Sequence, residues 1–127
     1  MRHDILLAEE VNGFVSRLTQ AYEAGDIDAY LSCYSLTATE NGMEYARIGT
    51  FYNTLFEEGR FRYSIGNMSI REESDEIKVN GVFAAGGLTE DNAGILRGTI
   101  AMTLMRIDGE LKMINASKGK DEARSDN

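Results

Sequence analysis

The spacing of apolar residues changes once along this chain of 127 residues, and this change restricts the possible folds more than any other feature. Up to residue 59 apolar side chains recur every three or four positions, as at Leu7, Val11 and Phe14, which is the period of a helix with one buried face. From Phe61 onward they alternate with polar residues, which is the period of a half-buried strand. Helices first and strands second predict an α+β fold.

Start and stop signals divide the first half into three helices. The apolar periodicity predicts helices over residues 4–24, 27–34 and 48–56. Gly25 supplies a left-handed stop for the first helix, Asp26 can cap the second, and Gly59 ends the third. Residues 35–40 form a short segment that connects the second helix to the third.

Turn signals divide the second half into strands. We predict strands over residues 61–70, 77–85, 95–107 and 111–117, with a bend at Gly66 and Asn67 and a hairpin turn at Asp108 and Gly109. Consecutive strands joined by short turns form an antiparallel meander, and the three helices must cover one of its faces. A single domain over residues 1–117 and a polar tail over residues 118–127 are expected.

Charge and composition exclude several classes of partner. The chain has 13 Lys and Arg against 21 Asp and Glu, a net charge of −8, so nucleic-acid backbones and anionic membrane surfaces repel it. No apolar run reaches the roughly 18 residues of a membrane-spanning helix, and the charged start is unlike a secretion signal, so a cytoplasmic location is expected. One cysteine and one histidine form neither an internal disulfide nor a His/Cys metal cage, so no metal or cofactor is expected.

The strand predicted over residues 95–107 has apolar side chains on both of its faces. Ile100, Met102 and Leu104 form one row, and a second apolar row includes Ala101. Helices on one side of a sheet cover only one such row, and the other would be exposed to water. The sequence therefore predicts a homodimer through the sheet, with Ile100, Met102 and Leu104 at the interface.

Two segments carry a resemblance to a known family. In AYEAGDIDAYLSCYS, at residues 21–35, the first helix turns through Gly and Asp into the second, and TLMRIDGELKMIN, at residues 103–115, is a closing hairpin. With this order of elements, the chain resembles the nuclear transport factor 2-like superfamily, the cone-shaped fold of ketosteroid isomerase and SnoaL-type polyketide cyclases. The resemblance implies three N-terminal helices packed on a curved antiparallel sheet, a pocket at the wide end, and dimers formed through the outer surface of the sheet.

The same resemblance identifies positions at which catalytic residues would be expected. Ketosteroid isomerase needs a tyrosine, an aspartate base and a protonated aspartic acid, but the resemblance places these three at Leu18, near Gly42 and at Thr103, respectively. SnoaL-type cyclases use a histidine or an aspartate in the cavity, and the one histidine here, His3, lies before the predicted first helix. Glu40 is the nearest replacement for a base, and the alternative interpretation is a solvated carboxylate ahead of the third helix.

Aromatic and small polar side chains make up the candidate ligand-binding set. The aromatic residues fall on elements that would line the cone, and uncharged polar residues on the closing strands would orient a ligand without acid/base chemistry. The set comprises Tyr30, Tyr34, Tyr52, Phe56, Tyr63, Phe83, Thr99, Thr103 and Asn115. The predicted function is the binding of a small apolar or aromatic molecule. The alternatives are a cyclase- or isomerase-type enzyme with Glu40 as acid/base, and a cone filled by its own aromatic side chains.

Overall fold

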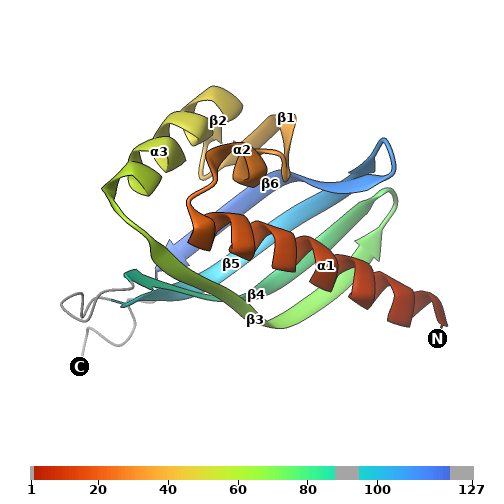
Figure 1. The fold of residues 1–127 in the computed structure, drawn as a ribbon. Coiled ribbons are helices and arrows are strands. Elements are labelled where there is room, and N and C mark those ends of the chain that lie inside the picture. Colours follow the sequence, from red (N-terminus) through yellow and green to blue (C-terminus); the bar gives the residue numbers. More distant parts are fainter. Residues whose placement is uncertain (1, 88–94, 121–127) are drawn as a thin grey trace.

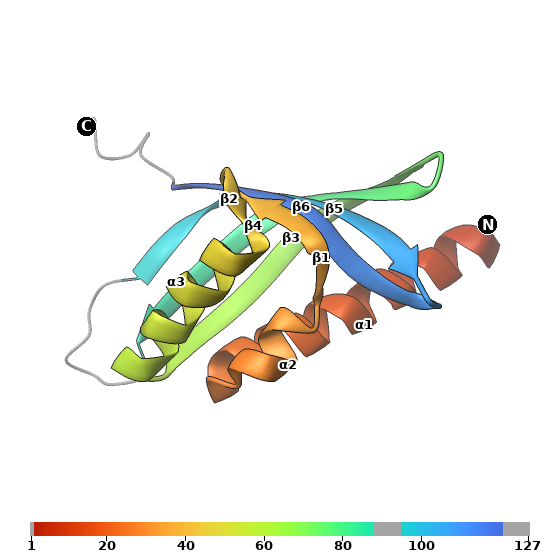
Figure 2. The same cartoon turned by 90° about the horizontal axis from the view of Figure 1, so that it is seen from above.

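The computed structural model describes residues 2–87 and 95–120, and this part of the chain confirms the α+β class. Its helices are α1 (Arg2–Ala24), α2 (Ile27–Leu31) and α3 (Tyr45–Glu58). Its strands are β1 (Tyr34–Glu40), β2 (Met43–Glu44), β3 (Phe61–Glu73), β4 (Glu76–Gly87), β5 (Ile95–Ile107) and β6 (Glu110–Lys120). The helices gather on one face of a single curved sheet, and no described helix covers the other face (Figures 1 and 2).

The sheet has the strand order β2-β1-β6-β5-β4-β3. Strands β3 to β6 form the predicted antiparallel meander, and the expected bend interrupts the β3–β4 register between Gly66 and Ser69. The segment over residues 35–40, expected to be a connection, belongs to β1 and adds a strand that pairs with β6 in parallel. Parallel neighbours need a long crossover connection, and α3 with β2 to β5 provides one here.

The corner between the first two helices forms as predicted, but the second helix ends earlier. Gly25 has a φ of +68°, and the side chain of Asp26 accepts a hydrogen bond from the Ala29 amide at 3.1 Å. Helix α2 ends at Leu31 instead of continuing to Tyr34. Tyr34 instead begins β1, because the carbonyl of Cys33 accepts a sheet hydrogen bond from the Met113 amide at 2.8 Å.

The predicted dimer interface is wrong in its choice of sheet face. Ile100, Met102 and Leu104 are at most 2% exposed, and they form part of the core beneath the helices. The opposite row of β5 includes the exposed Thr99 and Ala101, and it lies on the face that the described helices leave uncovered. The homodimer itself stays a prediction, and an interface through the sheet would use this outer face.

Strand β6 continues to Lys120, beyond the domain boundary expected at Ser117. Residues 118–120 are therefore part of the sheet, and residues 121–127 of the predicted tail lie outside the described residues. Across residues 2–87 and 95–120, no helix combines the length and apolar character needed to cross a membrane.

The position of Met102 in the core yields a stability prediction. A lysine at this site would place a charge among apolar side chains with no partner, so Met102→Lys should lower the free energy of unfolding by several kcal/mol. The exposed Thr54 on α3 offers a control, since Thr54→Lys should change stability by less than about 0.5 kcal/mol. Urea unfolding measures both changes. A folded Met102→Lys protein with the stability of the parent chain would indicate that Met102 is exposed, and it would contradict the placement of Met102 in the core.

Candidate functional site

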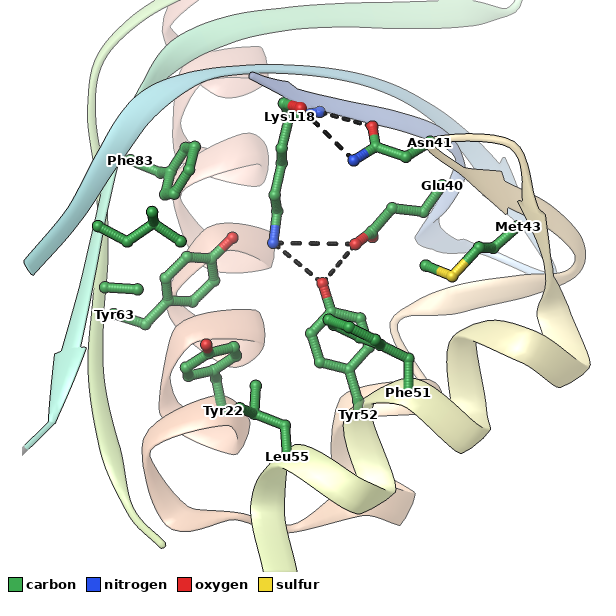
Figure 3. Close-up of a pocket in the computed structure, with 12 residues that line it drawn as sticks. Tyr22, Glu40, Asn41, Met43, Phe51, Tyr52, Leu55, Tyr63, Phe83 and Lys118 are labelled. Carbon is green, nitrogen blue, oxygen red and sulfur yellow. Dashed lines mark hydrogen bonds and ion pairs between the residues drawn. The ribbon is translucent and has the colours of Figure 1, made fainter. Parts of the chain in front are cut away.

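A cavity of about 380 Å³ lies between the helices and the concave face of the sheet (Figure 3). It is lined by one residue of α1, three residues of α3, residues at the end of β1 and just after it, and the inner faces of β3 to β6. The lining residues are Tyr22, Glu40, Asn41, Met43, Phe51, Tyr52, Leu55, Tyr63, Phe83, Ala85, Leu96 and Lys118. Both the helices and the sheet contribute lining residues. The cavity therefore forms only in the folded protein and does not correspond to any single sequence motif.

Glu40 accepts hydrogen bonds from two phenols in the cavity wall. It is 3% exposed, and the hydroxyl of Tyr34 donates to its Oε1 at 2.5 Å while that of Tyr52 donates to Oε2. The hydroxyl of Tyr30, 3.0 Å from that of Tyr34, extends the network deeper into the core. These charge-assisted hydrogen bonds replace part of the hydration that the carboxylate loses on burial.

Lys118 brings a positive charge to the same end of the cavity. Its Nζ donates to the Tyr52 hydroxyl at 3.0 Å and lies 3.9 Å from Oε2 of Glu40. The ammonium also lies 5.0 Å from the centre of the Tyr63 ring and 5.7 Å from that of Phe83, within the range of cation–π attraction. Aromatic faces and one carboxylate thus surround a cation whose side chain is 17% exposed.

The parallel pairing of β1 and β6 explains why Glu40 and Lys118 meet. Glu40 lies beside Ala116 in this pairing, and Ala116 packs in the core. Lys118 is two residues farther along β6, so its side chain points to the same inner face. The two charged side chains are therefore diagonal neighbours on adjacent strands.

The hydroxyl of Tyr63 has no hydrogen-bond partner among the residues that the structure describes. Tyr63 is 4% exposed, and its hydroxyl points into the cavity toward Lys118 (Figure 3). A buried hydroxyl that makes no hydrogen bond costs about 1–3 kcal/mol, so such a group in a cavity wall indicates a place for a polar ligand atom. The adjacent ring of Tyr22, with its centre 4.3 Å away, supports the Tyr63 ring from the α1 side.

Burial and neighbouring charged groups together shift the pKa values at this end of the cavity. Loss of hydration raises the pKa of Tyr52 and Tyr63 well above the usual value for a phenol, and the negative charge of Glu40 raises both further. For Lys118, burial lowers the pKa, but interactions with Tyr52 and Glu40 outweigh this effect and the pKa is raised. At neutral pH the site therefore holds neutral phenols and a charged ammonium.

The rest of the cavity lining is largely apolar. Phe51 is 51% exposed and Leu96 is 43% exposed, although both are large hydrophobic residues that line the cavity. Met43, Leu55 and Ala85 are further apolar side chains of the lining. The cavity is therefore amphipathic, because charged and phenolic groups gather at one part of its wall and apolar side chains, two of them exposed, form most of the rest.

Several of the residues predicted for the site are brought together by the fold. Glu40, Tyr52, Tyr63 and Phe83 line the cavity. The predicted set also included Tyr30, Tyr34 and Phe56, which are buried in the core and do not line the cavity. Glu40 is not the solvated carboxylate of the alternative interpretation, because it is buried and accepts two hydrogen bonds.

Three polar residues expected in the cavity lie on the outer face of the sheet instead. Thr99 and Asn115 are exposed, and Thr103 is covered by Lys78, whose Nζ donates to its hydroxyl at 3.3 Å. Successive residues of β5 alternate between the core and the outer face, and Thr99 and Thr103 belong to the outer row. The β5–β6 pairing also shifts in register between Thr103 and Leu104. An apolar pattern on both rows of β5 could not indicate which row faces inward.

Sequence reasoning missed Tyr22 and Lys118 as cavity residues. Tyr22 continues the apolar stripe of α1, a pattern that is equally typical of a core residue. Lys118 was expected in the polar tail, and only the extension of β6 beyond Ser117 places it in the sheet. Within residues 2–87 and 95–120, no group of three or more His, Cys, Asp or Glu side chains is placed to hold a metal ion.

No protein-family model and no curated protein matches the sequence, but the structure matches many solved ones. A function-unknown protein from Mycobacterium tuberculosis superposes with a TM-score of 0.86 at 12% identity, covering 98% of this chain and 78% of that one. A proposed scytalone dehydratase from Novosphingobium aromaticivorans gives 0.83 at 12% identity, covering 93% and 86%. A cystatin-like protein from Nostoc punctiforme gives 0.74 at 13% identity, covering 91% and 92%. The chain therefore shares the cystatin-like fold of these structures.

Proposed function

We propose that the cavity binds a small aromatic or apolar molecule that enters with its polar end first. The observation that carries this proposal is the polarity of the cavity, whose lining is largely apolar except for one part that holds an ammonium and a phenol with no hydrogen-bond partner among the described residues. Ligand sites in proteins are typically concave and largely apolar, with a few polar groups that orient the ligand. The exposed Phe51 and Leu96 support the same direction of entry, since an apolar ligand body would cover them.

The size of the cavity limits the ligand to one or two rings. A volume of about 380 Å³, with roughly 30 Å³ for each water-sized group, holds about a dozen non-hydrogen atoms. The side walls are the rings of Tyr22, Tyr63 and Phe83, which favour a flat partner. An aromatic ring system of this size with one polar substituent fits both limits.

Filling the cavity from its wall tests the proposed function. Ala85 lines the cavity, so Ala85→Leu should raise the dissociation constant for methyl naphthyl ketone about ten-fold or more, the change expected from roughly 1.4 kcal/mol of overpacking. Its neighbour Ala84 points to the outer face, and Ala84→Leu is the matched control that should leave binding unchanged. Titration calorimetry measures both. Equal binding by the two variants, or no binding by the parent chain, would refute the proposal.

A second candidate is an acid/base enzyme in which Glu40 is the base. The supporting observation is that Glu40 lies in the cavity wall, hydrogen-bonded to Tyr52 and close to Lys118. In such an enzyme Glu40 would take a proton from the carbon beside a ligand carbonyl, and the resulting enolate oxygen would be stabilised by the donors of Tyr63 and Lys118. The proton would return from Glu40 to the same or a different carbon.

Deuterium exchange separates this enzyme from a binding domain. If Glu40 is the base, the protein should accelerate uptake of deuterium from D₂O at the carbon beside the carbonyl of β-tetralone, as followed by NMR. Glu40→Gln should abolish the acceleration while β-tetralone still binds. Glu44→Gln, at an exposed carboxylate outside the cavity, should retain it. Exchange at the buffer rate in the parent chain would eliminate the enzymatic candidate and leave the binding domain.

A further inference from the structure

The polar end of the cavity offers hydrogen-bond donors to a ligand. The Tyr63 hydroxyl is unpartnered among the described residues, and an ammonium has three donors, of which Lys118 gives one to Tyr52. The hydroxyls of Tyr34 and Tyr52 already donate to Glu40. Tyr63 and Lys118 point toward the same space in Figure 3, so a ligand atom placed there should be an acceptor.

The charge of this end is already balanced. Glu40 and Lys118 are the only charged side chains among the cavity-lining residues in the described part of the chain, and their charged atoms are 3.9 Å apart. A carboxylate ligand would add a second negative charge beside Glu40 in a region with little water, and such an uncompensated charge is costly. A neutral acceptor can take the free hydrogen bonds without this cost.

We propose that the ligand is a neutral aromatic carbonyl compound, such as an aryl ketone or a quinone, whose oxygen accepts hydrogen bonds from Tyr63 and Lys118. A carbonyl oxygen has two lone pairs, one for each donor, and conjugation keeps it in the plane of the ring that Tyr22 and Phe83 contact. Glu40 is a specificity-determining residue in this arrangement, since its charge balances Lys118 and excludes carboxylates. The inference rests on the proposed function and names the class of ligand.

Three probes on one naphthalene frame test the class of ligand directly. Methyl naphthyl ketone has the neutral acceptor, ethylnaphthalene has the same shape without oxygen, and naphthoate has the negative charge. The ketone should bind to the unaltered chain about ten-fold or more tightly than ethylnaphthalene, as expected for hydrogen bonds that relieve a buried donor. Naphthoate should bind less tightly than the ketone. Dissociation constants come from ligand-observed NMR at constant pH.

Two substitutions assign the preference to named side chains. Tyr63→Phe should raise the dissociation constant for the ketone about three- to ten-fold, which corresponds to the loss of one hydrogen bond. The dissociation constant for ethylnaphthalene should not change. Tyr45→Phe removes a phenol outside the cavity and is the control. Glu40→Gln should invert the selectivity so that naphthoate gains affinity relative to the ketone, because Lys118 then lacks its counter-ion, whereas Glu44→Gln should keep the parental order.

The probe ranking in the unaltered chain decides the inference even if a variant fails to fold. Equal affinities for the ketone and ethylnaphthalene, or tightest binding of naphthoate, would overturn the neutral-carbonyl class and leave ligand binding intact. Absence of binding for all three probes would instead remove the proposed function together with the inference. A ketone preference that survives Tyr63→Phe unchanged would contradict the role given to the Tyr63 hydroxyl.

Discussion

A buried ion pair between Lys118 and Glu40 sets the balance of charge at the polar end of the cavity. An ammonium inside an aromatic cavity is stable only if a counter-charge and hydrogen-bond acceptors replace the water it has lost. Glu40 provides the charge and the Tyr52 hydroxyl accepts the hydrogen bond, while Tyr34 and Tyr52 both donate to Glu40. The Tyr63 hydroxyl beside this pair has no hydrogen-bond partner among the described residues, and in the proposed function it and the ammonium are the donors for a bound molecule.

The sheet topology creates this pair from residues far apart in the chain. Glu40 ends β1 and Lys118 lies near the end of β6, and the parallel pairing of these strands places the two side chains on the inner face. Helix α3 then adds Tyr52 from the opposite side, and β3 adds Tyr63. The positions that would match ketosteroid isomerase cannot supply a comparable set, because Leu18 packs in the core and Thr103 lies on the outer face of the sheet. The polar groups of this cavity therefore come from other positions than those that the resemblance to ketosteroid isomerase indicates.

The sequence was more informative about local structure than about the site. Strand β5 has the predicted bounds, and the corner at Gly25 and Asp26 forms as expected, because periodicity and capping depend on neighbouring residues. Glu40 could be proposed because it lies close to Gly42, near which the resemblance places a catalytic base, and strand alternation could point its side chain toward the cavity. Lys118 could not, because its place depends on how far β6 pairs with β5, which the polar sequence after Ser117 does not indicate. Thr99 was misplaced for a related reason, since both rows of β5 are compatible with burial.

A double-mutant cycle on Glu40→Gln and Lys118→Met most directly tests whether the two charges stabilise each other. Each single change leaves the other charge buried without its partner, whereas the double change removes both charges. The two losses in free energy of unfolding should therefore be non-additive. The loss in the double variant should be smaller than the sum of the two single losses by about 1 kcal/mol or more. Additive losses would mean that the two groups do not interact, and the buried pair could not then be the basis of the cavity's polarity.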